Sequence, residues 1–190
     1  MGSGFLVSHA MAQKTPKATI AVLFITGIMT LLQFSFPVLV AALARTPGMM
    51  AQGQCWRLIT PILINPEGWS QIVFNLLGIA IVGCLVERVF GSVRWLILYL
   101  TGAVVGELAG GLWKPVGAGS SAAICGLLGG LAAWLLRRRG PTQSRLGGTM
   151  ILLGALVLIG MRDLHGPPLV AGALVAAVML SRDARRADGT

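Results

Sequence analysis

The 190-residue chain is 55% hydrophobic and only 11% charged, and its mean hydropathy is +0.81. A soluble domain carries about 25% charged residues, so these values exclude a water-facing surface around a single core. The formal net charge of +9 does not indicate nucleic-acid binding, because the basic residues lie at the ends of apolar runs. We therefore expect an all-α, polytopic membrane protein.

The positions of the basic residues also predict a topology. With the N-terminus in the cytoplasm and six spans, most lysines and arginines would lie inside: Lys14, Lys17, Arg88, Arg94, Arg137, Arg138, Arg139, Arg145, Arg182, Arg185 and Arg186. The four that would lie outside are Arg45, Arg57, Lys114 and Arg162. This asymmetry follows the positive-inside rule and predicts cytoplasmic N- and C-termini. The absence of an organelle-targeting tail suits a prokaryotic plasma membrane.

The first part of the chain predicts a polar tail and one span. Residues 1–17 are expected to form a cytoplasmic N-terminal tail, and residues 18–44 form an apolar run long enough to cross a bilayer. The run ends in Ala42-Leu43-Ala44, which resembles a signal-peptidase site, so cleavage is the alternative. Because the run far exceeds a secretory apolar region of about 7–15 residues, an uncleaved helix is favoured. Pro37 is expected to kink it.

Residues 45–70 form the longest connection. Apolar and polar side chains alternate within it, as expected for a segment partly embedded at the outer interface. Five further spans are predicted over residues 71–86, 93–113, about 120–137, 147–161 and 165–180. They complete a membrane domain over residues 18–181, followed by a cytoplasmic C-terminal tail over 182–190. Glycine and alanine crowd the fourth span, which predicts a position at the bundle centre.

Polar residues interrupt the second, fourth and sixth spans near their starts: Gln71, Asn75, Ser120, Ser121 and His165. Alternate spans of a bundle enter from the same side, so these groups are expected at similar depth. Asn75, Ser121 and His165 would each lie within ~10 Å of the outer end of a helix. Polar groups buried in a membrane are costly and usually functional.

An alcohol, an amide and an imidazole are the groups that covalent serine chemistry needs. Ser121 is predicted in the first turn of its helix, where free N–H groups can hold an oxyanion. Gln71 and Asn75 share a helix face and offer amide donors for the same purpose. His165 is the only histidine outside the N-terminal tail, so it is the candidate general base.

Structural interpretations of the same residues remain open. The serines could be packing residues, Asn75 an interhelical hydrogen-bonding residue and His165 a helix cap. Ser120 replaces Ser121 as the nucleophile if the register slips by one residue. Because Asp163 is two residues from His165, we expect their side chains on different helix faces, without an orienting contact.

Glu107 lies inside the third predicted span, where a carboxylate is expensive. We expect a structural role for it, either in an ion pair with Arg57 or Lys114 or as a protonated group bonded to a backbone carbonyl.

Five short segments together resemble one family. They are residues 119–129 (GSSAAICGLLG), residues 165–172 (HGPPLVAG), residues 71–75 (QIVFN), the pair Trp56-Arg57 and residues 87–91 (ERVFG). In their order along the chain and in their spacing, they resemble the motifs of rhomboid intramembrane serine proteases. The resemblance covers residues 56–172 and implies a rhomboid-like bundle of six transmembrane helices.

The resemblance implies a role for each matched residue. Ser121 would be the nucleophile and His165 the base, in a dyad without a third carboxylate. Asn75 and the Ser121 N–H would form the oxyanion hole, and Gln71 stands where the family usually has a histidine. The remaining motif residues imply structural roles in the outer loop, the inner turn and helix packing: Trp56, Arg57, Glu87, Arg88, Gly91, Gly119, Gly126 and Gly172.

The chain also departs from the family pattern. Ala122 replaces a glycine, Cys125 replaces a common aromatic residue, and Pro167 and Pro168 follow His165. Two functions are therefore carried forward. One is a serine endopeptidase that cleaves transmembrane substrates near the outer face; the other is an inactive rhomboid-like protein that binds transmembrane helices for quality control or trafficking. A transporter or channel is disfavoured because the inner halves of the polar spans are apolar.

No cofactor or metal is expected, since the three cysteines are dispersed without ligand spacing. The expected partners are the lipid bilayer and transmembrane protein substrates, and no nucleic acid.

Overall fold

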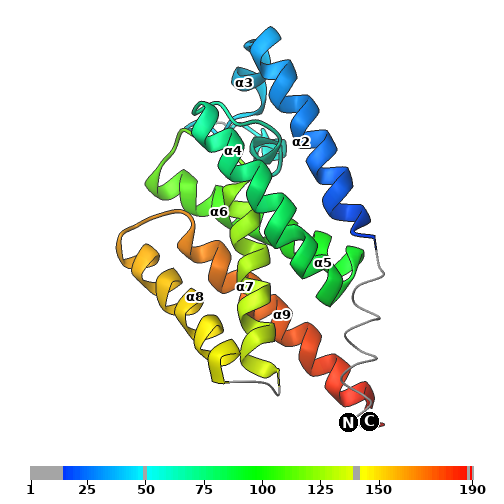
Figure 1. The fold of residues 1–190 in the computed structure, drawn as a ribbon. Helices are drawn as coiled ribbons and strands as arrows, with labels where there is room; N and C mark the ends of the chain where they lie inside the picture. The colour runs from blue at the N-terminus through cyan, green and yellow to red at the C-terminus, as the bar shows by residue number, and fades with distance from the viewer. Residues whose placement is uncertain (1–14, 49–50, 139–141, 188, 190) are drawn as a thin grey trace.

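The computed structural model describes residues 15–48, 51–138, 142–187 and 189. Within these ranges the regular elements are helices, and the β-type contact between Arg45 and Gly117 is an isolated antiparallel bridge. Figure 1 shows the helices gathered in one bundle, with the ends of α7 and α9 and the start of α8 at the same, lower end. Most of the predicted N-terminal tail, residues 1–14, lies outside the described residues.

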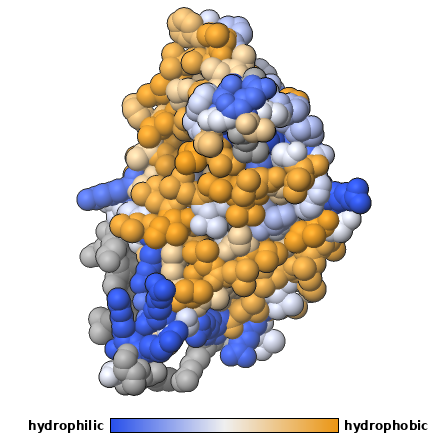
Figure 2. Space-filling model, turned by 180° about the vertical axis from the view of Figure 1, so that it is seen from behind, coloured by the Kyte–Doolittle hydropathy of each residue, from blue (hydrophilic) through white to orange (hydrophobic). Residues whose placement is uncertain are grey.

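Five described segments are long and apolar enough to cross a membrane: Lys17–Ser35, Trp69–Phe90, Ser92–Trp113, Thr142–Gly160 and Gly166–Ala187. A sixth apolar helix, α7 (Ser121–Arg137), is shorter, with 17 residues. Large apolar side chains face outward, among them Phe74 at 73% and Leu112 at 81% exposure. Figure 2 shows apolar residues over most of one face, with hydrophilic residues toward the lower end and in smaller patches near the top and at the two sides. Such a surface suits lipid and confirms the predicted all-α, multi-span class.

The first apolar run forms two helices instead of one kinked helix. Helix α2 (Lys17–Ser35) ends two residues before Pro37, and the short helix α3 (Val38–Leu43) follows that break. Proline lacks the N–H that a continuing helix would use, so the chain changes direction there.

The start of α2 is held by a carboxylate from another span. Glu87 accepts hydrogen bonds at 2.8 Å from the backbone N–H groups of Ala18 and Thr19, and at 2.7 Å from the Thr19 hydroxyl. It also accepts one from the Ser92 hydroxyl, just after the Gly91 turn, where φ is +77°. The free N–H groups of a helix start thus receive an anionic partner. Arg88, the other charged residue of this turn, is exposed.

The second span contains a local change of helix type. It consists of α4 (Trp69–Gly78), a π-helical turn labelled η3 (Ile79–Gly83), and α5 (Cys84–Phe90). The Gly83 carbonyl accepts a hydrogen bond at 3.0 Å from the Trp95 ring N–H of α6 (Ser92–Trp113). Backbone groups released by a π-turn need such partners, and here the partner ties the second span to the third.

The connection between α3 and α4 contains two 3₁₀ turns, η1 (Cys55–Leu58) and η2 (Thr60–Leu63). The buried Arg57 side chain donates hydrogen bonds to the carbonyls of Ala44 and Ala41 at the end of α3. The neighbouring Trp56 side chain is 52% exposed. Arg57 therefore fixes this connection against the helix that precedes it.

Helix α7 lies at the centre of the bundle, as its small residues predict, and packs against α4, α5, α6, α8 and α9. Gly126 is the residue that makes this possible, since a Cβ there would lie 2.7 Å from the Cα of Gly102 in α6. On the other side, a Cβ on Gly172 of α9 would overlap the Gly126 carbonyl. A side chain at either position would therefore separate α7 from a neighbour.

The last two helices extend beyond their predicted limits. Helix α8 (Thr142–Gly160) begins five residues before the predicted start, and α9 (Gly166–Ala187) continues seven residues past the predicted end. Most of the added residues are polar or charged, so the helices extend beyond the apolar stretches from which the spans were predicted. Both helices are therefore longer than the ranges predicted from hydropathy.

Candidate active site

Ser121 is the first residue of α7, and the backbone before it has an unusual shape. Gly119 has φ of +134°, a conformation that residues with a side chain rarely adopt. Gly119 and Ser120 turn the chain into the helix, so the Ser121 side chain stands at the helix start beside the free N–H groups of the first turn.

His165 immediately precedes α9, whose first residues are Gly166, Pro167 and Pro168. Prolines are tolerated in a first helical turn because those N–H groups have no partner within the helix. The Oγ atom of Ser121 lies 2.8 Å from the Nε2 atom of His165, although 44 positions separate the two residues. The alcohol and the imidazole therefore meet at hydrogen-bonding distance.

Ser120 has a different environment. Its side chain is fully buried, and its hydroxyl is not hydrogen-bonded to the His165 ring. It is also absent from the residues that line the cavity around Ser121. The contact with the imidazole thus belongs to Ser121 in this structure.

The expectation that Asp163 points away from His165 is wrong. The Asp163 Oδ1 atom lies 2.6 Å from the Nδ1 atom of the His165 ring, and it also accepts the His165 backbone N–H at 2.9 Å. The expectation assumed that both residues belong to a helix. Residues 161–165 instead form a turn in which Arg162 has φ of +56°, so the side chains at positions 163 and 165 can meet.

Two side-chain amides converge on the segment before Ser121. A Cβ on Gly119 would lie 2.7 Å from Nε2 of Gln71 and 3.2 Å from Nδ2 of Asn75. Gln71 donates to the Ala118 carbonyl at 2.8 Å and lines the cavity around Ser121. Asn75 is almost fully buried and donates to the Asn65 side-chain oxygen at 2.6 Å. Both amides lie beside the serine segment, but only Gln71 reaches the cavity surface.

The cavity around Ser121 and His165, called the polar cavity below, has a volume of about 90 Å³. Its lining combines the reactive pair with charged and small residues: Arg45, Glu67, Gln71, Glu107, Lys114, Val116, Gly117, Ala118, Gly119, Ser121, Ala122, Leu164 and His165. A volume of this size can hold a few water molecules, and the polar lining can bind them.

Glu107 pairs with Arg45, and not with Arg57 or Lys114 as expected. The Arg45 guanidinium lies 2.5 Å from the Glu107 carboxylate, and the two side chains are only 4% and 3% exposed. Arg45 also donates to the Lys114 carbonyl at 3.1 Å. The pair closes one wall of the polar cavity, which is a structural role for Glu107.

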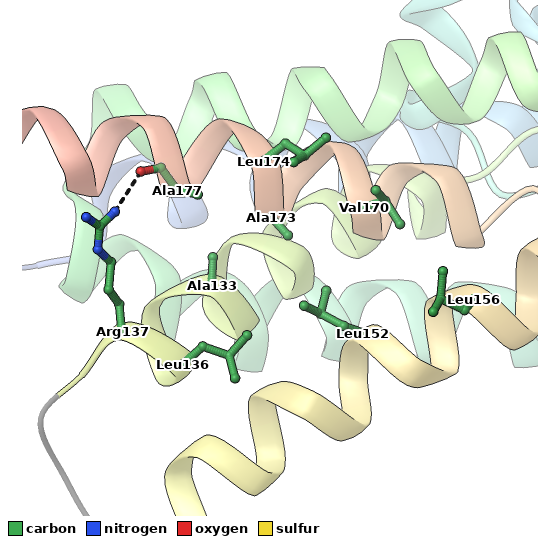
Figure 3. A pocket seen from close by; sticks show the side chains of 9 residues that line it. All are labelled: Ala133, Leu136, Arg137, Leu152, Leu156, Val170, Ala173, Leu174 and Ala177. Atoms are coloured by element: carbon green, nitrogen blue, oxygen red, sulfur yellow. Dashed lines mark hydrogen bonds between the residues drawn. The ribbon is translucent and has the colours of Figure 1, made fainter.

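A second, larger cavity of about 500 Å³ lies between α7, α8 and α9. Figure 3 shows the residues that line it, which are apolar except for Arg137: Ala133, Leu136, Arg137, Leu152, Leu156, Val170, Ala173, Leu174 and Ala177. The Arg137 side chain donates to the Ala177 carbonyl at 3.0 Å. This apolar groove contains no nucleophile or base, so it is not a candidate active site.

Within the described residues, no group of three or more His, Cys, Asp or Glu side chains could hold a metal ion. The groups gathered at the polar cavity are instead those of nucleophilic acyl transfer: a hydroxyl, an imidazole with a carboxylate behind it, and N–H donors.

Comparison with known proteins agrees with this arrangement. A family model for the rhomboid domain matches residues 52–181. The chain is 38% identical over 116 residues to the rhomboid protease GluP of Bacillus subtilis, a match that covers 60% of this chain and 23% of that protein. It is 32% identical over 114 residues to the putative rhomboid protease YdcA of the same organism, covering 57% of each.

The chain thus spans about a quarter of the first relative and just over half of the second. The family match is broader, and it includes the helices that carry Ser121 and His165 together with the turn before α9. Because that match covers more than half of the chain, the protein belongs to the rhomboid family.

Proposed function

We propose that this protein is an intramembrane serine endopeptidase that cleaves transmembrane protein substrates near the outer membrane face. Ser121 is the nucleophile and His165 the general base. The observation that carries the proposal is the 2.8 Å contact between Ser121 Oγ and His165 Nε2. Relatives named as rhomboid proteases support proteolysis at the level of the family.

The chemistry follows from the positions of the atoms. The Ser121 hydroxyl donates its proton to His165 Nε2 while Oγ attacks the carbonyl carbon of the scissile peptide bond. The imidazolium then gives that proton to the leaving amine, and a water molecule hydrolyses the acyl-enzyme by the reverse proton path. The polar cavity supplies a place for that water within an otherwise apolar bundle.

The oxyanion that forms during attack needs N–H donors beside Ser121. The first turn of α7 offers backbone N–H groups, and its helix dipole favours negative charge. The Gln71 and Asn75 amides next to Gly119 are further candidate donors. Gln71 lies at the cavity surface and is the more accessible of the two.

The outer location of the site rests on the charge distribution. Helices α7 and α9 carry arginines at their C-terminal ends. Ser121 is the first residue of α7, and His165 immediately precedes α9. The positive-inside rule assigns the arginine-rich ends to the cytoplasm. Both termini then lie inside, and the site lies toward the opposite face.

A covalent serine probe tests the proposal directly. Purified protein in detergent is incubated with a fluorophosphonate, and labelling is followed by gel fluorescence. We expect labelling of the wild type and of Ser120→Ala, and none of Ser121→Ala or His165→Ala. Thermal unfolding of each variant checks that it is folded.

A folded wild type that no probe labels would overturn the proposal. That outcome would favour the second candidate, an inactive family member that binds transmembrane helices. Labelling that disappears in Ser120→Ala but persists in Ser121→Ala would move the nucleophile to the neighbouring serine.

A further inference from the structure

We propose that Asp163 positions the imidazole of His165, so that the site works as a Ser–His–Asp arrangement. This inference rests on the proposed protease function and adds a third residue to it. Asp163 does not touch a substrate; it acts through the ring that it contacts, and it is therefore a positioning residue.

The contacts determine which ring nitrogen carries the proton. The carboxylate oxygen of Asp163 lies 2.6 Å from Nδ1, and an ionised carboxylate can only accept a hydrogen bond. Nδ1 therefore carries the hydrogen in the neutral ring. Nε2, which faces the Ser121 hydroxyl at 2.8 Å, is then free to accept the serine proton.

The carboxylate is itself held in place. Its Oδ1 atom accepts the His165 backbone N–H at 2.9 Å, and its Oδ2 atom lies 3.6 Å from the Lys114 ammonium. Backbone hydrogen bonds from Asp163 N–H to the Leu158 carbonyl, at 2.8 Å, and from Gly166 N–H to the Asp163 carbonyl, at 3.2 Å, fix the turn. The carboxylate and the ring thus have little freedom to separate.

Charge supports the same role. When the ring takes the serine proton it becomes a cation, and the adjacent carboxylate stabilises that cation. The other charged groups near the ring line the polar cavity: Lys114, Arg45, Glu107 and Glu67. Arg45 and Glu107 neutralise each other, and Lys114 pairs with Asp163 itself. Asp163 is the carboxylate that contacts the ring.

A purely structural role is the competing explanation. Asp163 could serve only to cap the turn through the His165 backbone N–H. Asp163→Asn separates the two roles, because the amide oxygen can still accept that N–H while the negative charge is lost. Asp163→Ala removes both contacts.

The experiment measures the rate constant of fluorophosphonate labelling, and kcat and KM on a transmembrane reporter substrate, across a pH series. We expect Asp163→Asn to lower the labelling rate and kcat by about 10- to 100-fold, with KM unchanged. This is less than the loss of about 10⁴-fold for a fully buried triad aspartate, because the Asp163 side chain is 27% exposed. The unfolding temperature should fall by no more than about 2–4 °C, the loss expected for one partly exposed charge contact, and the pH profile should change shape.

Asp183→Asn is the matched control. It also converts an aspartate to asparagine and breaks an ion pair, with Arg94, but at the opposite end of the bundle. We expect wild-type labelling from it. A second readout that needs no turnover is the ¹⁵N NMR spectrum of the His165 ring, which should report protonated Nδ1 in the wild type and a mixture of tautomers in Asp163→Asn.

Two outcomes would overturn the inference while leaving the proposed function intact. One is an Asp163→Asn variant that is labelled within about twofold of the wild type at every pH. The other is a rate loss that appears only together with a fall in unfolding temperature well beyond about 4 °C, as loss of a turn cap would give. An unlabelled wild type would instead remove the proposed function and this inference together.

Discussion

The two ends of helix α7 have opposite character. At its Ser121 end the helix borders a cavity of about 90 Å³ lined by charged and polar groups. At its Arg137 end it borders a groove of about 500 Å³ lined almost wholly by apolar side chains. The smaller cavity contains the Ser121–His165 pair. Volume alone would point to the Arg137 end, but the residues that line the apolar groove include no serine, histidine or carboxylate.

The ion pairs differ in the same way. Arg45 and Glu107, beside the polar cavity, are almost fully buried, whereas the side chains of Arg94 and Asp183 are 36% and 42% exposed. A buried pair that loses one partner leaves an unpaired charge in a poor solvent, while an exposed pair is replaced by water. The bundle is therefore expected to tolerate change far better at its Arg137 end.

The largest expected effect is the loss of unfolding free energy when the buried ion pair is broken, compared with the loss when the exposed pair is broken. Glu107→Gln keeps the side-chain shape but leaves the Arg45 charge without compensation, which should cost about 3–5 kcal/mol of unfolding free energy. Asp183→Asn should cost about 0–1 kcal/mol. Thermal unfolding in detergent measures both. Equal losses in the two variants would contradict the contrast between the ends.

A second variant sharpens the roles of the two amides at the Ser121 end. Gln71→Ala removes the amide donor at the cavity surface and should lower the fluorophosphonate labelling rate by about 10- to 100-fold, with little change in unfolding temperature. Asn75→Ala leaves the buried Asn65 side chain without its partner, so it should also cost about 1–3 kcal/mol of stability. If Gln71→Ala keeps the wild-type rate and Asn75→Ala alone is slow, Asn75 is the principal donor.

A third prediction concerns acid. Burial raises the pKa of the Asp163 carboxyl, but hydrogen bonds from the His165 backbone and ring, with the charges of His165 and Lys114, outweigh burial and hold that pKa below its ordinary value. A lowered folded-state pKa stabilises the fold above the unfolded-state pKa, and this contribution is lost as the pH falls through the folded-state value.

The difference in unfolding temperature between wild type and Asp163→Asn should therefore be present at about pH 5 and smaller at about pH 3. Ser120→Ala involves no titrating group, so its offset from the wild type should be the same at both pH values. If the wild type exceeded Asp163→Asn in unfolding temperature by more at about pH 3 than at about pH 5, the predicted direction of the pH dependence would be wrong.

The smallest expected effect lies at the Arg137 end. Leu156 lines the apolar groove and is 60% exposed, so Leu156→Ala should change the unfolding free energy by only about 0.5 kcal/mol. Its labelling rate should stay within about twofold of the wild type, since the groove does not reach Ser121. A tenfold loss of labelling would mean that the two ends of α7 are coupled.

The sequence predicted the class of fold well, because hydropathy reports directly which segments lie in lipid. It predicted helix ends poorly for the same reason. Helix α8 starts at Thr142 and α9 continues to Ala187, both through mostly polar residues that hydropathy does not count as part of a span. Hydropathy indicates which residues are apolar enough to lie in a membrane, whereas a helix ends where its backbone hydrogen bonds and caps end.

At the candidate site, the chain order of the polar residues predicted that Ser121 and His165 approach each other, and the structure has them in contact. The catalytic roles remain predictions. Two contacts were not predictable. Glu107 pairs with Arg45, 62 positions away, and no local sequence pattern specifies which distant segments pack against each other. Asp163 was assigned to a helix face although Arg162 interrupts the helix with a positive φ.

Gly126 limits how closely α7 can pack against its neighbours. It lies five positions after Ser121 and is in close contact with Gly102 of α6 on one side and Gly172 of α9 on the other. Because glycine has no Cβ, α7 can approach both helices at this point. His165 sits at the head of the helix that Gly172 brings close. A larger residue at position 126 would therefore be expected to separate Ser121 Oγ from His165 Nε2, although it contacts neither atom.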